Sequence, residues 1–65
     1  MNIETCHKYV KATECHTFFT KVNEDVFYVR IEDEVELYMD KDWNPILSAM
    51  KMAELAANIN WKPLK

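Results

Sequence analysis

Two copies of a Cys-His dipeptide near the start of the chain, Cys6-His7 and Cys15-His16, have the residue types of a zinc site. Zinc prefers thiolate and imidazole ligands, and four such side chains would complete one tetrahedral centre. The spacing is unfavourable, because paired zinc ligands usually lie about two to five positions apart and adjacent residues on a strand point to opposite faces. We therefore predict no metal, with the cysteines filling the core and the histidines exposed. A Cys/His zinc-binding module is the alternative.

The same dipeptides could be interpreted as a Cys-His nucleophilic pair. Such a pair needs a thiolate held against an imidazole, donors for an oxyanion and a substrate pocket. The sequence has no motif that would supply these parts, and a chain of 65 residues has little volume for a pocket. We expect no catalytic residues, no cofactor and a non-enzymatic function.

Residues 40–44 (DKDWN) reproduce the first acidic positions, D-x-D-x-N, of an EF-hand calcium loop. The pattern then fails, because Pro45 stands where the loop needs glycine and Lys51 stands where it needs a bidentate glutamate. Asn44 and Pro45 have the chemistry of a helix start, since asparagine is a favoured N-cap and proline fits the first helical position. The sequence therefore predicts a helix over about 44–59.

Negative charge is concentrated in the middle of the chain. Residues 24–42 carry eight carboxylates against Arg30 and Lys41, a net charge of −6, whereas the whole chain carries −3. Charge of this kind steers encounters with a basic partner, and aromatic side chains anchor the complex. We expect a docking surface for a basic protein surface. It would comprise Glu24, Asp25, Tyr28, Glu32, Asp33, Glu34, Glu36, Tyr38, Asp40, Asp42 and Trp43.

The acidic block has two other interpretations. Acids on turns and on an outer sheet face keep a small protein soluble and discourage edge-to-edge pairing of strands. In its extreme form, an acidic surface mimics the charge of a nucleic acid and inhibits a DNA- or RNA-binding protein. Direct nucleic-acid binding is disfavoured, because the block would repel a phosphate backbone.

Alternating side chains predict a three-stranded antiparallel meander over about 15–22, 26–31 and 35–39, joined by three-residue connections. Residues 2–14 fit a short helix or an irregular segment. If they are helical, the element order resembles that of double-stranded-RNA-binding domains, which place basic residues where this chain has Asp40 and Asp42. The fold class is α+β, with the helix over 44–59 packed on the sheet.

The expected C-terminal helix has two apolar rows. Ile46, Met50, Ala53 and Ala57 share the face that we expect to lie on the sheet. The second row, Met52, Leu55 and Ile59, would be covered by the N-terminal segment or would form a homodimer interface. A purely structural homodimeric domain is therefore a further alternative.

Length and composition set the frame for these expectations. A chain of 65 residues with 49% hydrophobic content fits a single domain over 1–65 and excludes a disordered chain. The first nine residues lack the apolar run of a secretory signal, and no window approaches the length of a membrane span. We expect a cytoplasmic protein with reduced thiols and no membrane partner.

Overall fold

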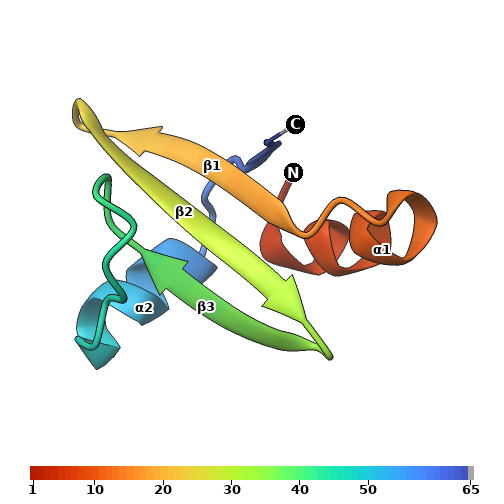
Figure 1. The fold of residues 1–65 in the computed structure, drawn as a ribbon. Helices are drawn as coiled ribbons and strands as arrows, with labels where there is room; N and C mark the ends of the chain where they lie inside the picture. Colours follow the sequence, from red (N-terminus) through yellow and green to blue (C-terminus); the bar gives the residue numbers. More distant parts are fainter. Residues whose placement is uncertain (65) are drawn as a thin grey trace.

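The computed structural model describes residues 1–64 and combines helices with one antiparallel sheet (Figure 1). In chain order the elements are α1 (Ile3–Thr13), β1 (Thr17–Val22), β2 (Asp25–Glu32), β3 (Val35–Met39), α2 (Ala49–Ala56) and β4 (Lys62–Pro63). The strands lie in the order β3-β2-β1-β4, and both helices cover the same face of the sheet. The predicted α+β class and the three-stranded meander are confirmed, and β4 is an addition that the sequence analysis missed.

Two-residue turns join the three long strands, where the sequence analysis expected three-residue connections. Asn23 and Glu24 form the first turn, with φ of 51° and 71°, and Asp33 and Glu34 form the second, with φ of 50° and 65°. Positive φ at both central residues is the geometry of a type I′ hairpin, which matches the twist of the strands. Glycine usually takes the second position, so its absence from the chain concealed both turns.

The lead-in segment is the helix α1. The side chain of Asn2 caps it by accepting a 2.8 Å hydrogen bond from the backbone N–H of Thr5. Glu14 ends it in the left-handed conformation, with φ of 60°. The helix buries Cys6 and packs Tyr9 and Val10 against the core. Of the two alternatives for residues 2–14, the helical one is confirmed.

One hydrophobic core lies between the sheet and the helices. It contains Cys6, Phe18, Val29, Ile31, Tyr38, Leu55 and Trp61. The indole of Trp61 is 1% exposed and donates a 3.3 Å hydrogen bond to the backbone oxygen of Leu55. Beyond Trp61 the chain pairs with β1 as β4. The segment after α2 is therefore a structural part of the core rather than a tail.

The C-terminal helix is shorter than predicted, and its N-terminal boundary in the sequence analysis was wrong. Ser48 is the N-cap, and its side chain accepts a hydrogen bond from the backbone N–H of Lys51. Asn44 and Pro45 do not start the helix, because this segment runs beside β3. The N–H of Ile46 donates to Tyr38 O at 2.9 Å, which pulls the segment into an extended conformation.

The face of α2 that contacts the sheet is also the opposite of the predicted one. Met50 is 85% exposed, whereas Leu55 is 1% exposed and Met52 and Ile59 pack against the core. The row with the larger side chains buries more apolar area than the alanine-rich row, so it is the one that docks. Leu55 is thus part of the protomer's own core and does not face a second copy.

Candidate protein-docking surface

The face of the sheet opposite the helices is not covered by any element of the described chain, and we call it the open face. Cross-strand partners share a face, and Phe18, Val29 and Tyr38 point toward the helices. Their neighbours therefore point to the open face, namely Phe19, Lys21, Val26, Tyr28, Arg30, Glu32, Val35, Leu37 and Met39. Val35 is 67% exposed and Leu37 is 45% exposed. The open face therefore combines two exposed apolar side chains with the charged side chains of Lys21, Arg30 and Glu32.

An aromatic pair lies at one end of the open face. The rings of Trp43 and Tyr28 stack with their centroids 3.7 Å apart and an interplanar angle of 15°. Trp43 is still 48% exposed and has a left-handed backbone, with φ of 65°. A bulky residue in this conformation is a genuine outlier that costs about 1–2 kcal/mol. The surrounding loop must hold it there.

Hydrogen bonds to Asp40 hold the loop that carries Trp43. The side-chain Oδ1 of Asp40 accepts hydrogen bonds from the backbone N–H of Asp42 at 2.9 Å and of Asn44 at 3.0 Å. The backbone oxygen of Asp40 accepts from the N–H of Trp43 at 3.0 Å. The D-x-D-x-N pattern is therefore explained by a loop that folds around one carboxylate. Asp40 is a positioning residue for Trp43.

Acidic side chains lie at the start of β2 and in the loop that carries Trp43. We call Glu24, Asp25, Asp40 and Asp42 the acidic end, which comprises four carboxylates with one cation, Lys41, among them. Asp25 and residues 40–42 line a hollow of about 180 Å³ together with Val26 and Phe27. Pockets for small ligands are usually about 300–1,000 Å³, so this hollow has the size for a single side chain. Its carboxylates favour a basic one.

Two of the three acids at the opposite end of β2 are already paired. Glu32 forms a 2.6 Å ion pair with Arg30, and Glu34 forms a 3.2 Å ion pair with Lys11. Within residues 1–64, none of the ion pairs involves Glu24, Asp25 or Asp42. The predicted acidic surface is thus divided along the strand: four of its unpaired carboxylates belong to the acidic end, whereas at the other end of the described strand only the exposed Asp33 is unpaired.

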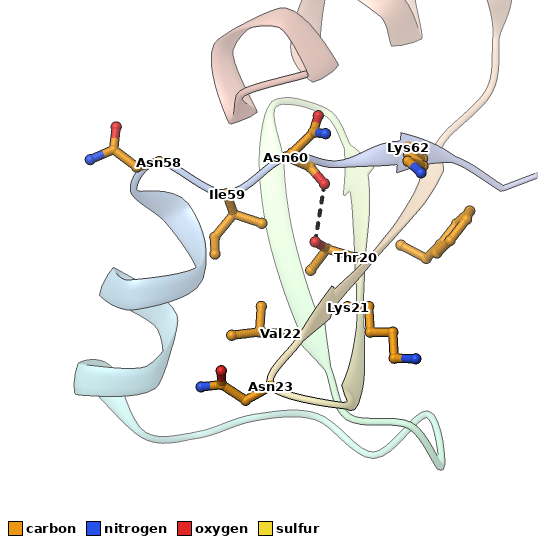
Figure 2. A pocket seen from close by; sticks show the side chains of 9 residues that line it. Thr20, Lys21, Val22, Asn23, Asn58, Ile59, Asn60 and Lys62 are labelled. Carbon is orange, nitrogen blue, oxygen red and sulfur yellow. Dashed lines mark hydrogen bonds between the residues drawn. The ribbon is translucent and has the colours of Figure 1, made fainter.

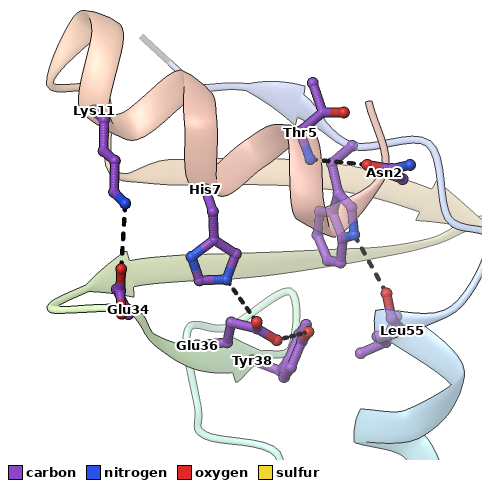
Figure 3. A network of polar contacts seen from close by, with 9 residues as sticks. Asn2, Thr5, His7, Lys11, Glu34, Glu36, Tyr38 and Leu55 are labelled. Atoms are coloured by element: carbon purple, nitrogen blue, oxygen red, sulfur yellow. Dashed lines mark hydrogen bonds and ion pairs between the residues drawn. The ribbon is translucent and has the colours of Figure 1, made fainter.

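Glu36 and Tyr38 lie on the helix side of the sheet, so the structure separates them from the other residues of the predicted surface. The carboxylate of Glu36 lies 2.7 Å from Nε2 of His7 on α1, and it accepts a 2.5 Å hydrogen bond from the hydroxyl of Tyr38 (Figure 3). Tyr38 is 4% exposed. Alternation along β3 explains the placement, because Val35, Leu37 and Met39 take the other face. The two residues tie α1 to the sheet.

Burial and hydrogen bonding oppose each other at Glu36. Desolvation raises the pKa of its carboxyl, but the hydrogen bonds from Tyr38 and His7 outweigh that effect, and the net result is a lowered pKa. For Tyr38, burial is the largest cause of a raised pKa, and the neighbouring Glu36 adds to it. The network therefore holds Glu36 ionised and Tyr38 neutral.

The Cys-His dipeptides are not brought together. Cys6 is fully buried, and burial raises the pKa of its thiol to about 11. His7 contacts Glu36, and His16 donates a 2.8 Å hydrogen bond through Nδ1 to the backbone oxygen of Ile31. Both histidines are half-buried, so the prediction that they are exposed was wrong. In residues 1–64 no three potential metal ligands of the His, Cys, Asp and Glu types converge.

Comparison with protein-family models, with curated proteins and with solved structures finds no match for this chain. Neither α1 nor α2 has the length and apolar composition needed to cross a bilayer, and the rest of residues 1–64 forms no other candidate. Sequence reasoning missed the contributions of Phe19, Val35 and Leu37 to the open face. Their alternation with core residues was the signal that could have revealed them.

Proposed function

We propose that this protein is a small, non-enzymatic binding protein that docks a basic segment of a partner protein at the Trp43 end of its open face. Trp43 and Tyr28 would supply the apolar anchor. The carboxylates of Asp25 and Asp42 would meet a lysine or arginine of the partner in the adjacent hollow. The function is one of recognition, and it needs no cofactor.

The observation that carries the proposal is the conformation of Trp43. Tryptophan is highly buried on average, and Trp61 is 1% exposed. Trp43 instead occupies a strained backbone position, stacks flat on Tyr28 and leaves about half of its surface open. Strain of this kind clusters at binding sites, because the fold must supply the energy to maintain it.

The partner chemistry follows from the surrounding charges. A guanidinium or ammonium group near an exposed indole gains a cation–π attraction of about 0.5–1 kcal/mol at an exposed site. Unpaired carboxylates within the same area add direct attraction and steer the encounter. The same charges would repel a nucleic-acid backbone at this end, so a basic protein segment is the favoured partner.

The other functions considered from the sequence have less support. A mimic of nucleic-acid charge needs a continuous row of unpaired acids, whereas Glu32 and Glu34 are neutralised by Arg30 and Lys11. A homodimer through Met52, Leu55 and Ile59 would have to expose a side chain that is 1% accessible in the protomer. The two free cysteines fit a reducing compartment, so we place the function in the cytoplasm.

Backbone NMR of the labelled protein, titrated with a synthetic peptide rich in arginine and lysine, tests this proposal. Saturable shifts are expected at Asp25, Tyr28 and residues 40–44, with weakening as salt is raised because exposed charges are screened. A peptide of the same length with glutamates in place of the basic residues is the control and should cause no shifts.

Two outcomes would count against the proposal. Shifts that do not saturate, or that spread evenly over every acidic residue, would show only nonspecific attraction. Saturable shifts confined to the turn Asp33-Glu34 would place the docking surface at the other end of β2.

A further inference from the structure

A second site lies at the other edge of the sheet, in a cleft of about 480 Å³ between β1 and the segment that follows α2 (Figure 2). We propose that this cleft binds a small organic anion of the size and chemistry of a nucleoside monophosphate. The volume falls within the range of about 300–1,000 Å³ that is usual for small-molecule sites. The inference does not rest on the docking of a basic protein segment, because the cleft shares no residue with the hollow lined by Asp25 and residues 40–42, although Phe19 and Lys21 belong to the open face.

The shape of the cleft follows from an interrupted strand pairing. β4 pairs with β1 only at Phe18 and Phe19. The hydroxyl of Thr20 donates a 3.0 Å hydrogen bond to the backbone oxygen of Asn60, which closes that end of the cleft (Figure 2). Beyond this bond the two segments are not paired. The cleft therefore opens toward the turn at Asn23.

The charge of the cleft is opposite to that of the chain as a whole. Lys21 and Lys62 line it from the side of the open face, and within residues 1–64 no carboxylate lines it. Neither lysine takes part in an ion pair of the described chain. Two unpaired ammonium groups in a protein of net charge −3 give a local preference for an anion, and lysine is a common phosphate ligand.

The remaining walls fit a nucleoside better than a bare anion. Asn23 and Asn58 line the cleft, and a side-chain amide offers both a donor and an acceptor to the edge of a base. Asn60 also lines it and keeps only its amide NH2 for a ligand, because its Oδ1 accepts a 2.6 Å hydrogen bond from the N-terminal ammonium of Met1. Asn23 and Asn58 occupy left-handed positions, with φ of 51° and 49°, which fixes their backbone at the turns beside the cleft. Phe19, Val22 and Ile59 add apolar surface. Ring systems with polar edges are recognised by this combination.

Titration of the labelled protein with AMP, GMP, CMP and UMP, followed by NMR, tests the inference. At least one nucleotide is expected to cause saturable shifts in residues 19–23 and 58–62. Lys21→Glu and Lys62→Glu should each weaken binding about tenfold, because each removes a charged hydrogen-bond donor. Lys8→Glu, an exposed position on α1, changes the net charge equally and should leave the affinity unchanged.

The inference is overturned by any of three results. No saturable shift with any of the nucleotides at millimolar concentration would remove the site. Equal weakening by Lys8→Glu would show a general charge effect. Inorganic phosphate binding as tightly as the best nucleotide would show an anion site that does not recognise a nucleoside. Circular dichroism of each variant establishes that it is folded.

Discussion

The indole of Trp43 lies flat on the phenol ring of Tyr28, with centroids 3.7 Å apart, on the side of the sheet that the helices leave uncovered. This contact joins the loop after β3 to the middle of β2. The contact fixes the side chain of Trp43, whose backbone conformation is unfavourable, and leaves it half-exposed at the surface. The proposed docking of a basic segment depends on this arrangement more than on the number of acids nearby.

The different exposure of the two tryptophans gives a direct spectroscopic prediction. Trp43 is 48% exposed and Trp61 is 1% exposed, so the neutral quencher acrylamide should quench mainly one part of the fluorescence of the native protein. Trp43→Phe should remove the quenchable part and leave the fold intact. Quenching that is unchanged in Trp43→Phe would mean that Trp43 is covered in solution.

The turns predict an unusual gain in stability from glycine. Glu24 has φ of 71°, a conformation that costs a non-glycine residue about 1–2 kcal/mol, whereas glycine adds an entropy cost of about 0.5–1 kcal/mol. Glu24→Gly should therefore raise the free energy of unfolding by about 0.5–1 kcal/mol, measured by urea denaturation. Glu24→Ala keeps the strained conformation and should give no gain.

Glu34→Gly should gain less than Glu24→Gly. The substitution relieves φ of 65° but removes the ion pair with Lys11. Exposed ion pairs contribute about 0.2–1 kcal/mol, which offsets much of the benefit. A larger gain in the free energy of unfolding from Glu34→Gly than from Glu24→Gly would contradict the stabilising role of the ion pair between Glu34 and Lys11.

The strands were predictable, because alternation along the chain reports directly on the two faces of a sheet. The bounds of β3 agree with the expected 35–39. The start of α2 was not predictable from Asn44 and Pro45, because their local preference for a helix start loses to the pairing of this segment with β3. Tertiary contacts decided the boundary.

The corrected face of α2 predicts unequal effects of two alanine substitutions. Leu55→Ala should lower the free energy of unfolding by about 2–5 kcal/mol through the cavity that it leaves. A domain of this size has roughly 3–10 kcal/mol in total, so this variant should be largely or completely unfolded on heating to moderate temperature. Met50→Ala should have little effect, because Met50 is 85% exposed. Thermal denaturation compares them, and similar losses would contradict the observed face.

The Glu36 network predicts a pH-dependent part of the stability. Because the folded pKa of Glu36 is lowered from 4.5, its contribution is fully present above that value and is lost as the pH falls through the folded pKa. Glu36→Gln should cost about 1–3 kcal/mol at neutral pH, as expected for a hydrogen-bonded charge. The difference from the wild type should shrink in urea denaturations carried out toward about pH 3.

Glu34→Gln is the matched control for that series, since Glu34 is a surface partner of Lys11 whose side chain is 73% exposed. It should cost no more than the contribution of an exposed ion pair, about 0.2–1 kcal/mol, which is less than the cost of Glu36→Gln at neutral pH. A difference between the wild type and Glu36→Gln that stays constant down to low pH would show that the carboxylate of Glu36 is not the source of the effect.

The sequence located the candidate docking residues but not their division. Charge counting treats residues 24–42 as one block, because it cannot reveal that Glu32 and Glu34 meet Arg30 and Lys11. Arg30 lies on the same strand as Glu32, whereas Lys11 lies on α1 and is brought near Glu34 only by the fold. In the same way, the D-x-D-x-N pattern showed a special loop but not that Asp40 would fold it around its own carboxylate.

The central claim is that the unpaired acids beside Trp43, and not the acidic block as a whole, recognise a basic segment. Isothermal titration of one arginine- and lysine-rich peptide against two double variants tests it most directly. Glu24→Lys with Asp42→Lys and Glu32→Lys with Glu34→Lys change the net charge by the same amount. We expect the first pair to weaken binding at least about tenfold and the second by less than about threefold. Equal weakening by both pairs, or a greater effect of the second, would contradict the account.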